Sequence, residues 1–513
     1  MACARFVAPL PVRSRAGSAG RWSVGSASHD IPQTRGTVRS KEEPAQPVKE
    51  KAGSCANGLL TDLAQAKSGM HQLSLTATPR NRAGALALEI YARVLNSVRA
   101  DHLVEQALRL EDGVLRAGDR SIPLANVHRI FVVGAGKAAA AMAAGLEQVL
   151  GNRIAGGLVV TKHGHRVETR HVRVVEAAHP IPDEASLAAG AAIMDIAQNA
   201  GAEDLLICLI SGGASALMEL PVEGVALQDL QTVTDLLLRS GAAIQEVNRV
   251  RASLSRIKAG GLARAAAPAR VLCLAVSDVL GNPPGAIGSG PCVPQAKGGE
   301  SAWAVLQRYG LARDIPENVR RALDAPRSAS EPQPYVDFQV IGDIGLALDV
   351  ACGCAEELGL NPLLLTRWMQ GEAREIGTLM GAIARDLPHA ANRSGVHCLV
   401  LGGEPTVTVR GAGRGGRAQE LALAAALAMG EEPRTVALLA AGTDGTDGPT
   451  DAAGALVDGS TVGRVKAAGG DPVSALNNND SYTALDSAGA LVVTGPTQSN
   501  VNDLVILVHA EEE

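Results

Sequence analysis

Hydrophobic positions along the chain follow two periods in turn, and their alternation predicts helices and strands from about residue 81 onward. Apolar residues first recur at helical spacing, through Leu86, Ile90, Val94 and Val98. In the first half, the pattern predicts strands at 129–133, 157–161, 172–176, 205–210 and 271–276, and helices at 137–149, 184–199 and, as a pair, within 227–258. Continuous apolar strands separated by helices indicate parallel strands that are buried on both faces.

The alternation resumes beyond a proline- and glycine-rich stretch (279–294), two further helices and a polar linker near 325–336. It predicts strands at 337–341, 362–366, 397–401, 406–410, 435–440, 491–494 and 504–508, and helices at 344–358, 372–387 and 417–429. We therefore predict an α/β protein with a Rossmann-like N-terminal lobe and a mostly parallel sheet over 81–330, and a second α/β lobe over 331–513. The cleft between two such lobes is the expected place of the active site.

Residues 1–80 lack this periodicity and are rich in Ala, Ser, Pro, Gly and Arg. The first 29 residues contain four arginines and no acidic residue before Asp30, which is typical of an organelle transit peptide. A disordered extension has the same composition, so both interpretations stay open. We expect a cytoplasmic protein, with a mitochondrion or plastid as the alternative if residues 1–30 act as a transit peptide.

Charge and composition exclude some classes of binding partner. The 513 residues carry a net charge of −6, so the surface gives no long-range attraction toward nucleic acid or anionic membranes. The aromatic residues, 2% of the chain, are too few for base-stacking platforms. No apolar run reaches the roughly 18–20 residues of a membrane span. We expect a small-molecule substrate, no nucleic-acid or membrane partner, and a homodimer as the assembly to test.

The eight cysteines form no C-x-x-C pair. Cys208, Cys273 and Cys398 lie within apolar strand patterns, which favours reduced, buried thiols in a cytosol-like compartment. Cys352 and Cys354 fall on a helical pattern, so we do not expect that pair to bind a metal.

A glycine-rich turn lies between the first predicted strand and helix. The segment from Gly134 through Gly136 and Lys137 satisfies the dinucleotide fingerprint G-x-G-x-x-G/A, and a helix N-terminus there would bind an anion. Two features oppose a dinucleotide: the next strand ends in Thr161-Lys162 rather than an acidic residue, and Lys137 adds a positive charge. The Walker A spacing also fails. A phosphate or carboxylate ligand is favoured, with a dehydrogenase as the alternative.

Small and polar residues follow two later strands. Ser211, Gly212, Gly213 and Ser215 come after strand 205–210, where they would line a pocket or form only a tight turn. Asp278 follows strand 271–276, at the end of the sheet where α/β proteins place ligands.

A further polar segment lies between these strands. Asn248, Arg251 and Ser255 fall on one helical face, which Lys258 continues. A solvated charged face is the alternative to a substrate site there.

The second half carries glycine-rich polar loops at strand ends and helix starts. They contain Glu404, Arg414 with Arg417, Asp444 with Asp447, and Asn479. Mg²⁺ prefers one or two carboxylates together with phosphate oxygens, and arginine and backbone N–H groups neutralise the remaining charge. The loops therefore predict a site for a magnesium-bound polyphosphate. A calcium EF-hand does not fit, because its twelfth position would be Ala455.

Taken together, the motifs resemble those of class II glycerate kinases (glycerate 2-kinases), which have a MOFRL-type C-terminal domain. The resemblance covers about residues 83–510 and rests on these segments: 134–138, 179–183, 210–217, 256–263, 402–406, 413–420, 442–449 and 479–481. Ala214 and Ala259 replace glycines that are frequent in the family. The resemblance implies ATP- and Mg²⁺-dependent phosphorylation of D-glycerate to 2-phosphoglycerate. NAD(P)H-dependent hydroxypyruvate reductase is the alternative.

With this resemblance, each candidate residue receives a hypothetical role. Lys137 binds the glycerate carboxylate or stabilises the transferring phosphoryl group, and Asp278 or Asp444 is the base or a Mg²⁺ ligand. The metal candidates are Asp444, Asp447 and Glu404, and Arg417 binds phosphate as a catalytic residue. The substrate-binding candidates are Ser211, Gly212, Gly213, Ser215, Asn248 and Lys258. The nucleotide-binding candidates are Gly134, Gly136, Glu404, Arg414 and Asn479.

Overall fold

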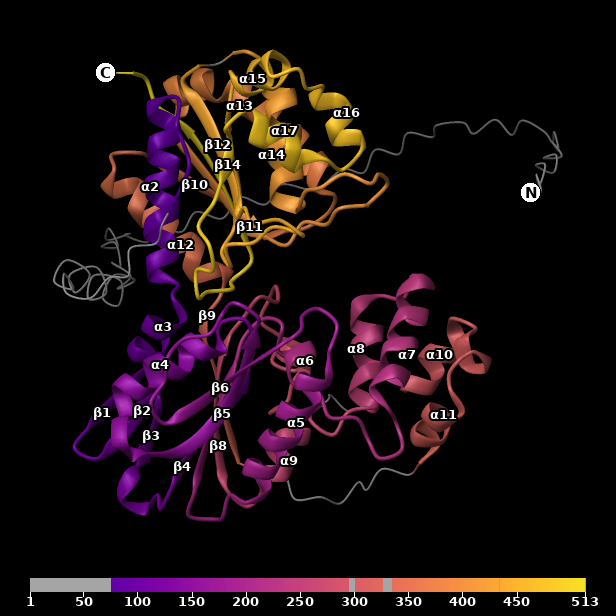
Figure 1. Cartoon of the computed structure of the whole chain (residues 1–513). Helices are drawn as coiled ribbons and strands as arrows, with labels where there is room; N and C mark the ends of the chain where they lie inside the picture. The colour runs from indigo at the N-terminus through magenta and orange to yellow at the C-terminus, as the bar shows by residue number, and fades with distance from the viewer. Residues whose placement is uncertain (1–74, 295–299, 326–334, 433, 513) are drawn as a thin grey trace, which may run out of the picture. The chain divides into compact units, whose positions relative to one another are not determined.

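The computed structural model describes residues 75–294, 300–325, 335–432 and 434–512 (Figure 1). The described residues all belong to one compact unit. Most of the predicted N-terminal extension lies outside the described residues. Within its last part, Thr76 forms an isolated antiparallel bridge with Val493 through two backbone hydrogen bonds of 2.8 and 3.0 Å, before the predicted start of order at residue 81.

The first large sheet is wholly parallel and has the strand order of a doubly wound nucleotide-binding fold. Its order is β6-β5-β4-β7-β8-β9. The strands are β4 (Ile130–Ala135), β5 (Ile154–Lys162), β6 (Val172–Ala177), β7 (Leu205–Ile210), β8 (Arg270–Val276) and β9 (Val336–Gly342). The chain reverses its direction of growth between β4 and β7, and ligands bind at such switch points. The predicted Rossmann-like lobe is confirmed.

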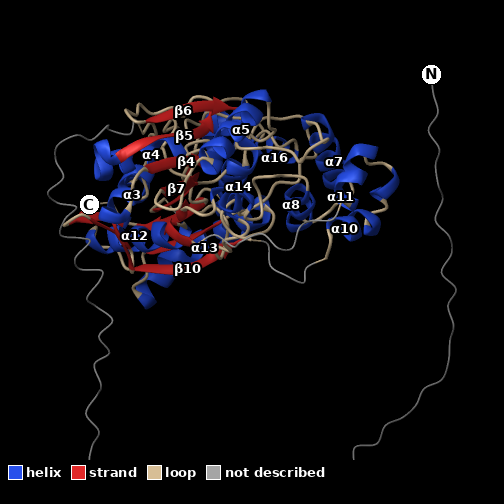
Figure 2. Ribbon diagram, turned by 90° about the horizontal axis from the view of Figure 1, so that it is seen from below, coloured by secondary structure: helices blue, strands red, loops and turns tan. Residues whose placement is uncertain are grey.

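Helices flank the strands of this sheet (Figure 2). The residues of these strands alternate between two hydrophobic cores. Leu209 on β7 belongs to the core of α4 (Ala139–Leu150), whereas Cys208 belongs to that of α5 (Glu184–Gln198) and α9 (Gly261–Ala266). A third core joins α7 (Leu227–Arg239), α8 (Ile244–Ser253), α10 (Ala302–Arg308) and α11 (Glu317–Asp324). The other elements of this half are α3 (Ala100–Ala107), β1 (Leu108–Glu111), β2 (Val114–Ala117), β3 (Arg120–Pro123) and α6 (Ala214–Leu217).

The second large sheet is mixed, with the order β10-β11-β15-β12-β13-β14 and parallel pairing only between β10 and β11. Its strands are β10 (Pro362–Met369), β11 (Cys398–Gly403), β12 (Val436–Gly442), β13 (Gly454–Asp458), β14 (Leu491–Val492) and β15 (Asp503–His509). Its helices are α12 (Ile344–Glu357), α13 (Ala373–Ser394), α14 (Arg417–Met429), α15 (Thr461–Ala467), α16 (Pro472–Asn477) and α17 (Ser481–Ser487). The predicted α/β class is confirmed for this half too.

One strand prediction fails in this half, and one strand is not predicted. Residues 406–410 form no strand: the backbone N–H and hydroxyl of Thr408 donate to the Glu372 carboxylate at 2.9 and 3.0 Å, and Val409 is exposed. Thr406 makes one isolated parallel bridge with Glu372, and beyond it side-chain hydrogen bonds replace a ladder, so the alternating pattern belongs to an exposed loop. β13 was not predicted, because its short segment follows a loop rich in glycine and aspartate.

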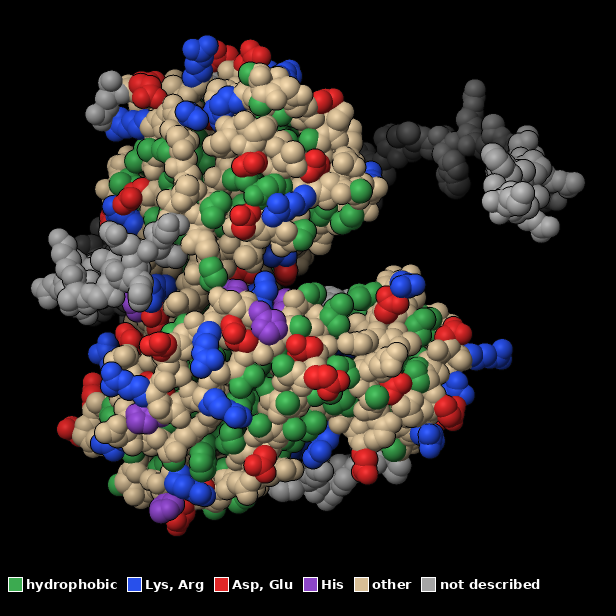
Figure 3. All heavy atoms as spheres, viewed as in Figure 1, with side chains coloured by type: hydrophobic (Ala, Val, Ile, Leu, Met, Phe, Trp, Pro, Cys, Tyr) green, Lys and Arg blue, Asp and Glu red, His purple; other side chains and the backbone are tan. Residues whose placement is uncertain are grey.

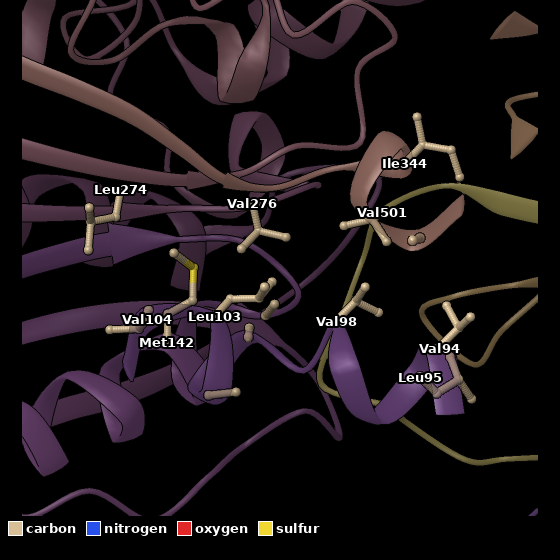
Figure 4. Packing of buried hydrophobic residues seen from close by; sticks show 14 of the residues in the cluster. Val94, Leu95, Val98, Leu103, Val104, Met142, Leu274, Val276, Ile344 and Val501 are labelled. Carbon is tan, nitrogen blue, oxygen red and sulfur yellow. The ribbon is translucent and has the colours of Figure 1, made fainter. Parts of the chain in front are cut away.

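The predicted division at residue 330 also needs correction. β9 begins after it yet completes the first sheet, and α2 (Arg82–Ser97) packs against the second, where the Tyr91 hydroxyl donates to the Gly442 carbonyl at 2.6 Å. One buried core includes residues of both halves, among them those labelled in Figure 4: Val94, Leu95, Val98, Leu103, Val104, Met142, Leu274, Val276, Ile344 and Val501. Hydrophobic periodicity predicts the type of an element but not the sheet that it joins.

Basic and acidic side chains are interspersed over the described residues on the face drawn in Figure 3. Among the described helices, none combines the length and the apolar character needed to cross a membrane.

Candidate active site

Two glycine-containing loops meet at the switch point of the first sheet. The backbone N–H of Lys137 donates to the Gly212 carbonyl at 2.9 Å, and that of Ala138 donates to Ser211 Oγ at 3.0 Å. Gly136 has a φ of 137°, and a Cβ there would lie 2.1 Å from Ser211 Oγ. Gly134 is equally crowded, with 2.1 Å to the Leu209 carbonyl oxygen. These glycines allow the close approach of the two loops. Ser211 is buried, and its hydroxyl accepts a hydrogen bond from the loop that contains Lys137.

Replacing Gly136 by alanine is therefore expected to lower the free energy of unfolding by about 1–3 kcal/mol, because the added methyl overlaps Ser211. Urea denaturation measures this change. Gly353→Ala on α12 is the matched control, since nothing lies within 4 Å of its Cβ position. Equal stability of the two variants would contradict the close approach.

Lys137 joins this loop to the second sheet. Its Nζ donates to Asp444 Oδ2 at 2.6 Å, and both side chains are largely buried. Asp444 follows β12, and its Oδ1 accepts the N–H of Thr446 at 3.0 Å. Burial alone would raise the pKa of Asp444, but the charge and hydrogen bond of Lys137 hold it below its ordinary value. Asp444 is therefore a carboxylate at neutral pH.

Asp278 lies beside the second switch-point loop. A Cβ on Gly212 would be 2.0 Å from Asp278 Oδ2, so only glycine fits there. The amide of Asn500 donates to the same oxygen at 2.9 Å, and that of Asn502 donates to the Asp278 carbonyl at 2.6 Å. Burial, followed by the negative charge of Glu404, raises the pKa of Asp278 to about 6. A carboxylate with this pKa is suited to accept a proton near neutral pH.

Arg417 bridges two carboxylates at the start of α14. Its Nη1 donates to Glu404 Oε1 at 2.9 Å, and its Nε lies 2.6 Å from Asp503 Oδ2. Burial alone would lower the pKa of Arg417, but the two carboxylates raise it, so the guanidinium is permanently charged. Arg417 also lowers the pKa of Asp444. The two ion-pair groups therefore belong to one electrostatic site.

Comparison with known proteins identifies the family of this chain. The MOFRL family model matches residues 397–503, and a domain of unknown function (DUF4147) matches 86–324. D-glycerate 2-kinase of Thermotoga maritima is 41% identical, over 82% of this chain and 97% of that protein. The chain belongs to the glycerate 2-kinase family. Glycerate 2-kinase of Pyrococcus horikoshii is 38% identical over 74% of this chain and 87% of its own length.

A crystal structure of a family member, glycerate kinase of Thermotoga maritima, has the same fold. Its TM-score is 0.72 at 40% identity, and the match covers 83% of this chain and 99% of that chain. The family assignment and the two-sheet architecture thus rest on both sequence and structure.

The three predicted metal ligands do not gather into one cluster. Among the described residues, no close group of three or more potential ligands contains Asp444, Asp447 and Glu404. Asp447 instead caps α14: its two oxygens accept the N–H groups of Ala418 and Gln419 at 3.2 and 2.8 Å. Burial and the charge of Asp503 raise the pKa of Asp447 to about 7. The spacing of the aspartates in the sequence did not reveal this capping role.

Two of the predicted substrate-binding residues, Ser215 and Lys258, form hydrogen bonds within the protein. Ser215 Oγ lies 2.7 Å from Ser289 Oγ. Lys258 is buried and donates to Glu219, whose other oxygen accepts the Ser255 hydroxyl at 2.6 Å. The predicted helical face is also wrong beyond Ser253, where α8 ends. Asn248 remains on α8, half-buried.

Removing the charge of Lys258 should destabilise the protein. In Lys258→Met, Glu219 stays buried without its partner, which costs about 3–5 kcal/mol of unfolding free energy. Arg239→Met, which breaks an exposed pair with Asp235, is the control and should cost at most about 1 kcal/mol. Both values come from urea denaturation. A loss no larger than that of the control would show that the buried pair is not structural.

Arg414 and Asn479 support the loop before α14. The Arg414 guanidinium lies 4.1 Å from the ring centroid of Tyr482 and is half-exposed. Asn479 Oδ1 accepts the N–H groups of Arg410 and Gly411 at 2.7 and 3.0 Å, and its Nδ2 donates to Glu420 at 2.9 Å. Asn479 thus fixes the backbone of this glycine-rich loop, and Arg414 is the more accessible candidate for phosphate.

Sequence reasoning did not assign site roles to Asp503, Asn500 or His179. Asp503 pairs with Arg417, and Asn500 with Asp278. His179 lies 3.1 Å, through Nε2, from the Cβ position of Gly213. Burial and the charge of Lys137 lower the pKa of His179 to about 4, so its imidazole is neutral at pH 7. The sequence does hold a signal for each of them. Asp503 and Asn500 are polar residues near a strand end, and His179 lies in the family-like segment 179–183.

Proposed function

We propose that this chain transfers the γ-phosphoryl group of ATP to the 2-hydroxyl of D-glycerate, yielding 2-phosphoglycerate and ADP. Family membership supports the reaction, since the relatives named above carry that activity in their names. The observation that carries the proposal is the position of Lys137 at the Rossmann-like switch point, paired with Asp444 of the second sheet.

The residues act mainly by positioning and charge, as phosphoryl transfer requires. Asp278 accepts the proton of the 2-hydroxyl while that oxygen bonds to the γ-phosphorus and the bond to the β-phosphate oxygen breaks. Lys137 and Arg417 offset the negative charge of the transferred group. The backbone at Gly212 lies so close to Asp278 that any side chain there would overlap the carboxylate.

Two of the three predicted metal ligands are suited to Mg²⁺. Asp444 and Glu404 supply hard carboxylate oxygens, and Mg²⁺ is commonly held by one or two such groups with phosphate and water. When bound, the ion would offset phosphate charge. Asp447 is the weaker candidate, because both of its oxygens already accept backbone N–H groups.

A product assay tests the proposal. Purified protein with D-glycerate, ATP and Mg²⁺ is expected to form ADP and 2-phosphoglycerate in equal amounts, identified by phosphorus NMR. A parallel reaction with hydroxypyruvate and NADH or NADPH tests the reductase alternative. Oxidation of the nicotinamide without ADP formation from glycerate would reverse the assignment.

A further inference from the structure

Three cysteines from distant parts of the sequence converge inside the first sheet's core. Cys208 on β7 and Cys273 on β8 are direct partners in the register of these parallel strands. Cys292 follows β8 by a long loop. The three sulfur atoms lie within 4.8 Å of one another, and all three residues are buried. Among the described residues, this is the only close group of three or more potential metal ligands.

Backbone contacts place Cys292 beside the strand pair. The N–H of Ala259 donates to the Ser289 carbonyl at 3.0 Å, that of Gly260 to Gly290 at 2.7 Å, and that of Ala263 to Pro291 at 3.3 Å. The loop before Cys292 is thereby fixed to the start of α9. The position of the third sulfur thus follows from the fold as well as from its own side-chain rotamer.

We propose that Cys208, Cys273 and Cys292 form a three-sulfur site for a soft, thiophilic cation of the Cu(I) type. Thiolates select soft ions. A metal–sulfur bond of about 2.3 Å places the sulfurs of a trigonal site roughly 4 Å apart, within the observed limit. Structural Zn²⁺ normally has four ligands, and the group supplies three. The site is separate from the phosphoryl-transfer residues and does not depend on the proposed kinase activity.

The surroundings favour a soft ion over a hard one. The cysteines lie in an apolar core that includes Ile210, Leu262 and Ala275. Cys292 also lines a pocket of about 350 Å³ together with Arg264, Val293 and Phe338, so open space reaches one of the three proposed ligands.

Anaerobic Cu(I) competition tests the site. The background is the full chain with Cys3, Cys55, Cys352 and Cys354 replaced by serine, which leaves Cys398 as the only cysteine besides the three proposed ligands. Against a chromophoric Cu(I) chelator, this background should retain one Cu(I) per chain. Cys292→Ala should weaken retention at least tenfold, whereas Cys398→Ala, buried in β11, should leave it unchanged.

Thermal denaturation with and without Cu(I) gives a second readout. A bound ion raises the midpoint of the background and of Cys398→Ala but leaves that of Cys292→Ala unchanged. Cys273→Ser provides a second ligand variant if Cys292→Ala fails to fold, and it should also lose the ion. Absence of Cu(I) retention by the background, equal retention after loss of a ligand, or preference for Zn²⁺ would each overturn the proposal.

Discussion

Lys137→Met is expected to lower kcat for D-glycerate phosphorylation by about 10²-fold or more. Lys137 is the cation that joins the first sheet's switch point to Asp444, and its Nζ lies 2.6 Å from that carboxylate. Methionine keeps the approximate length of the side chain but removes the charge. Asp444 then stays largely buried without its partner, and the transferring phosphoryl group loses a neutralising charge.

Steady-state kinetics with MgATP and D-glycerate measure this effect. Lys466→Met, which alters an exposed lysine on α15, is the matched control and should keep wild-type kcat. Urea denaturation of Lys137→Met checks that the fold persists at assay temperature. A folded variant with kcat within threefold of wild type would contradict the catalytic role of Lys137.

Asp278→Asn should lower kcat by about 10²-fold, within the range typical of general-base removal. Asparagine preserves the size of the side chain but cannot take the proton of the 2-hydroxyl at neutral pH. Asp235→Asn, an exposed substitution on α7, serves as control and should have no effect. Activity of Asp278→Asn near the wild-type value would remove Asp278 as the base.

The pH dependence of kcat/KM distinguishes this role from a structural one. Because the pKa of Asp278 is raised to about 6, the wild-type value should fall as pH decreases below 6, where the carboxylate becomes protonated and inactive as a base. The Asp278→Asn profile should lack this acid limb, while titration of the substrates is common to both enzymes. Identical limbs in both profiles would show that another group is responsible.

Much of the fold could be predicted from hydrophobic periodicity. The helix predicted at 417–429 is α14 with the same bounds, and the strand predicted at 205–210 is β7. A long, strongly periodic segment buries one defined face, so its own sequence determines whether it forms a helix or a strand. The membership of β9 in the first sheet and of α2 beside the second depends on contacts between distant segments, which no local pattern records.

The residues of the candidate site could likewise be predicted from the sequence only in part. Lys137, Asp278, Asp444 and Arg417 could be selected because each stands directly after a strand or at the start of a helix. The partners that set their charge states could not be assigned, because Asp503 is distant in sequence from Arg417, and Asn500 from Asp278. Ser215 and Lys258 were predicted to bind substrate because polar residues near glycines resemble a pocket lining, but they hydrogen-bond within the protein.

A crystal structure of the full chain with D-glycerate, Mg²⁺ and a non-hydrolysable ATP analogue tests the central claim most directly. We predict the glycerate 2-hydroxyl within hydrogen-bond distance of the Asp278 carboxylate and the γ-phosphate beside Lys137, at the switch point of the first sheet. Ligands bound elsewhere, with Lys137 and Asp278 contacting neither, would contradict the account.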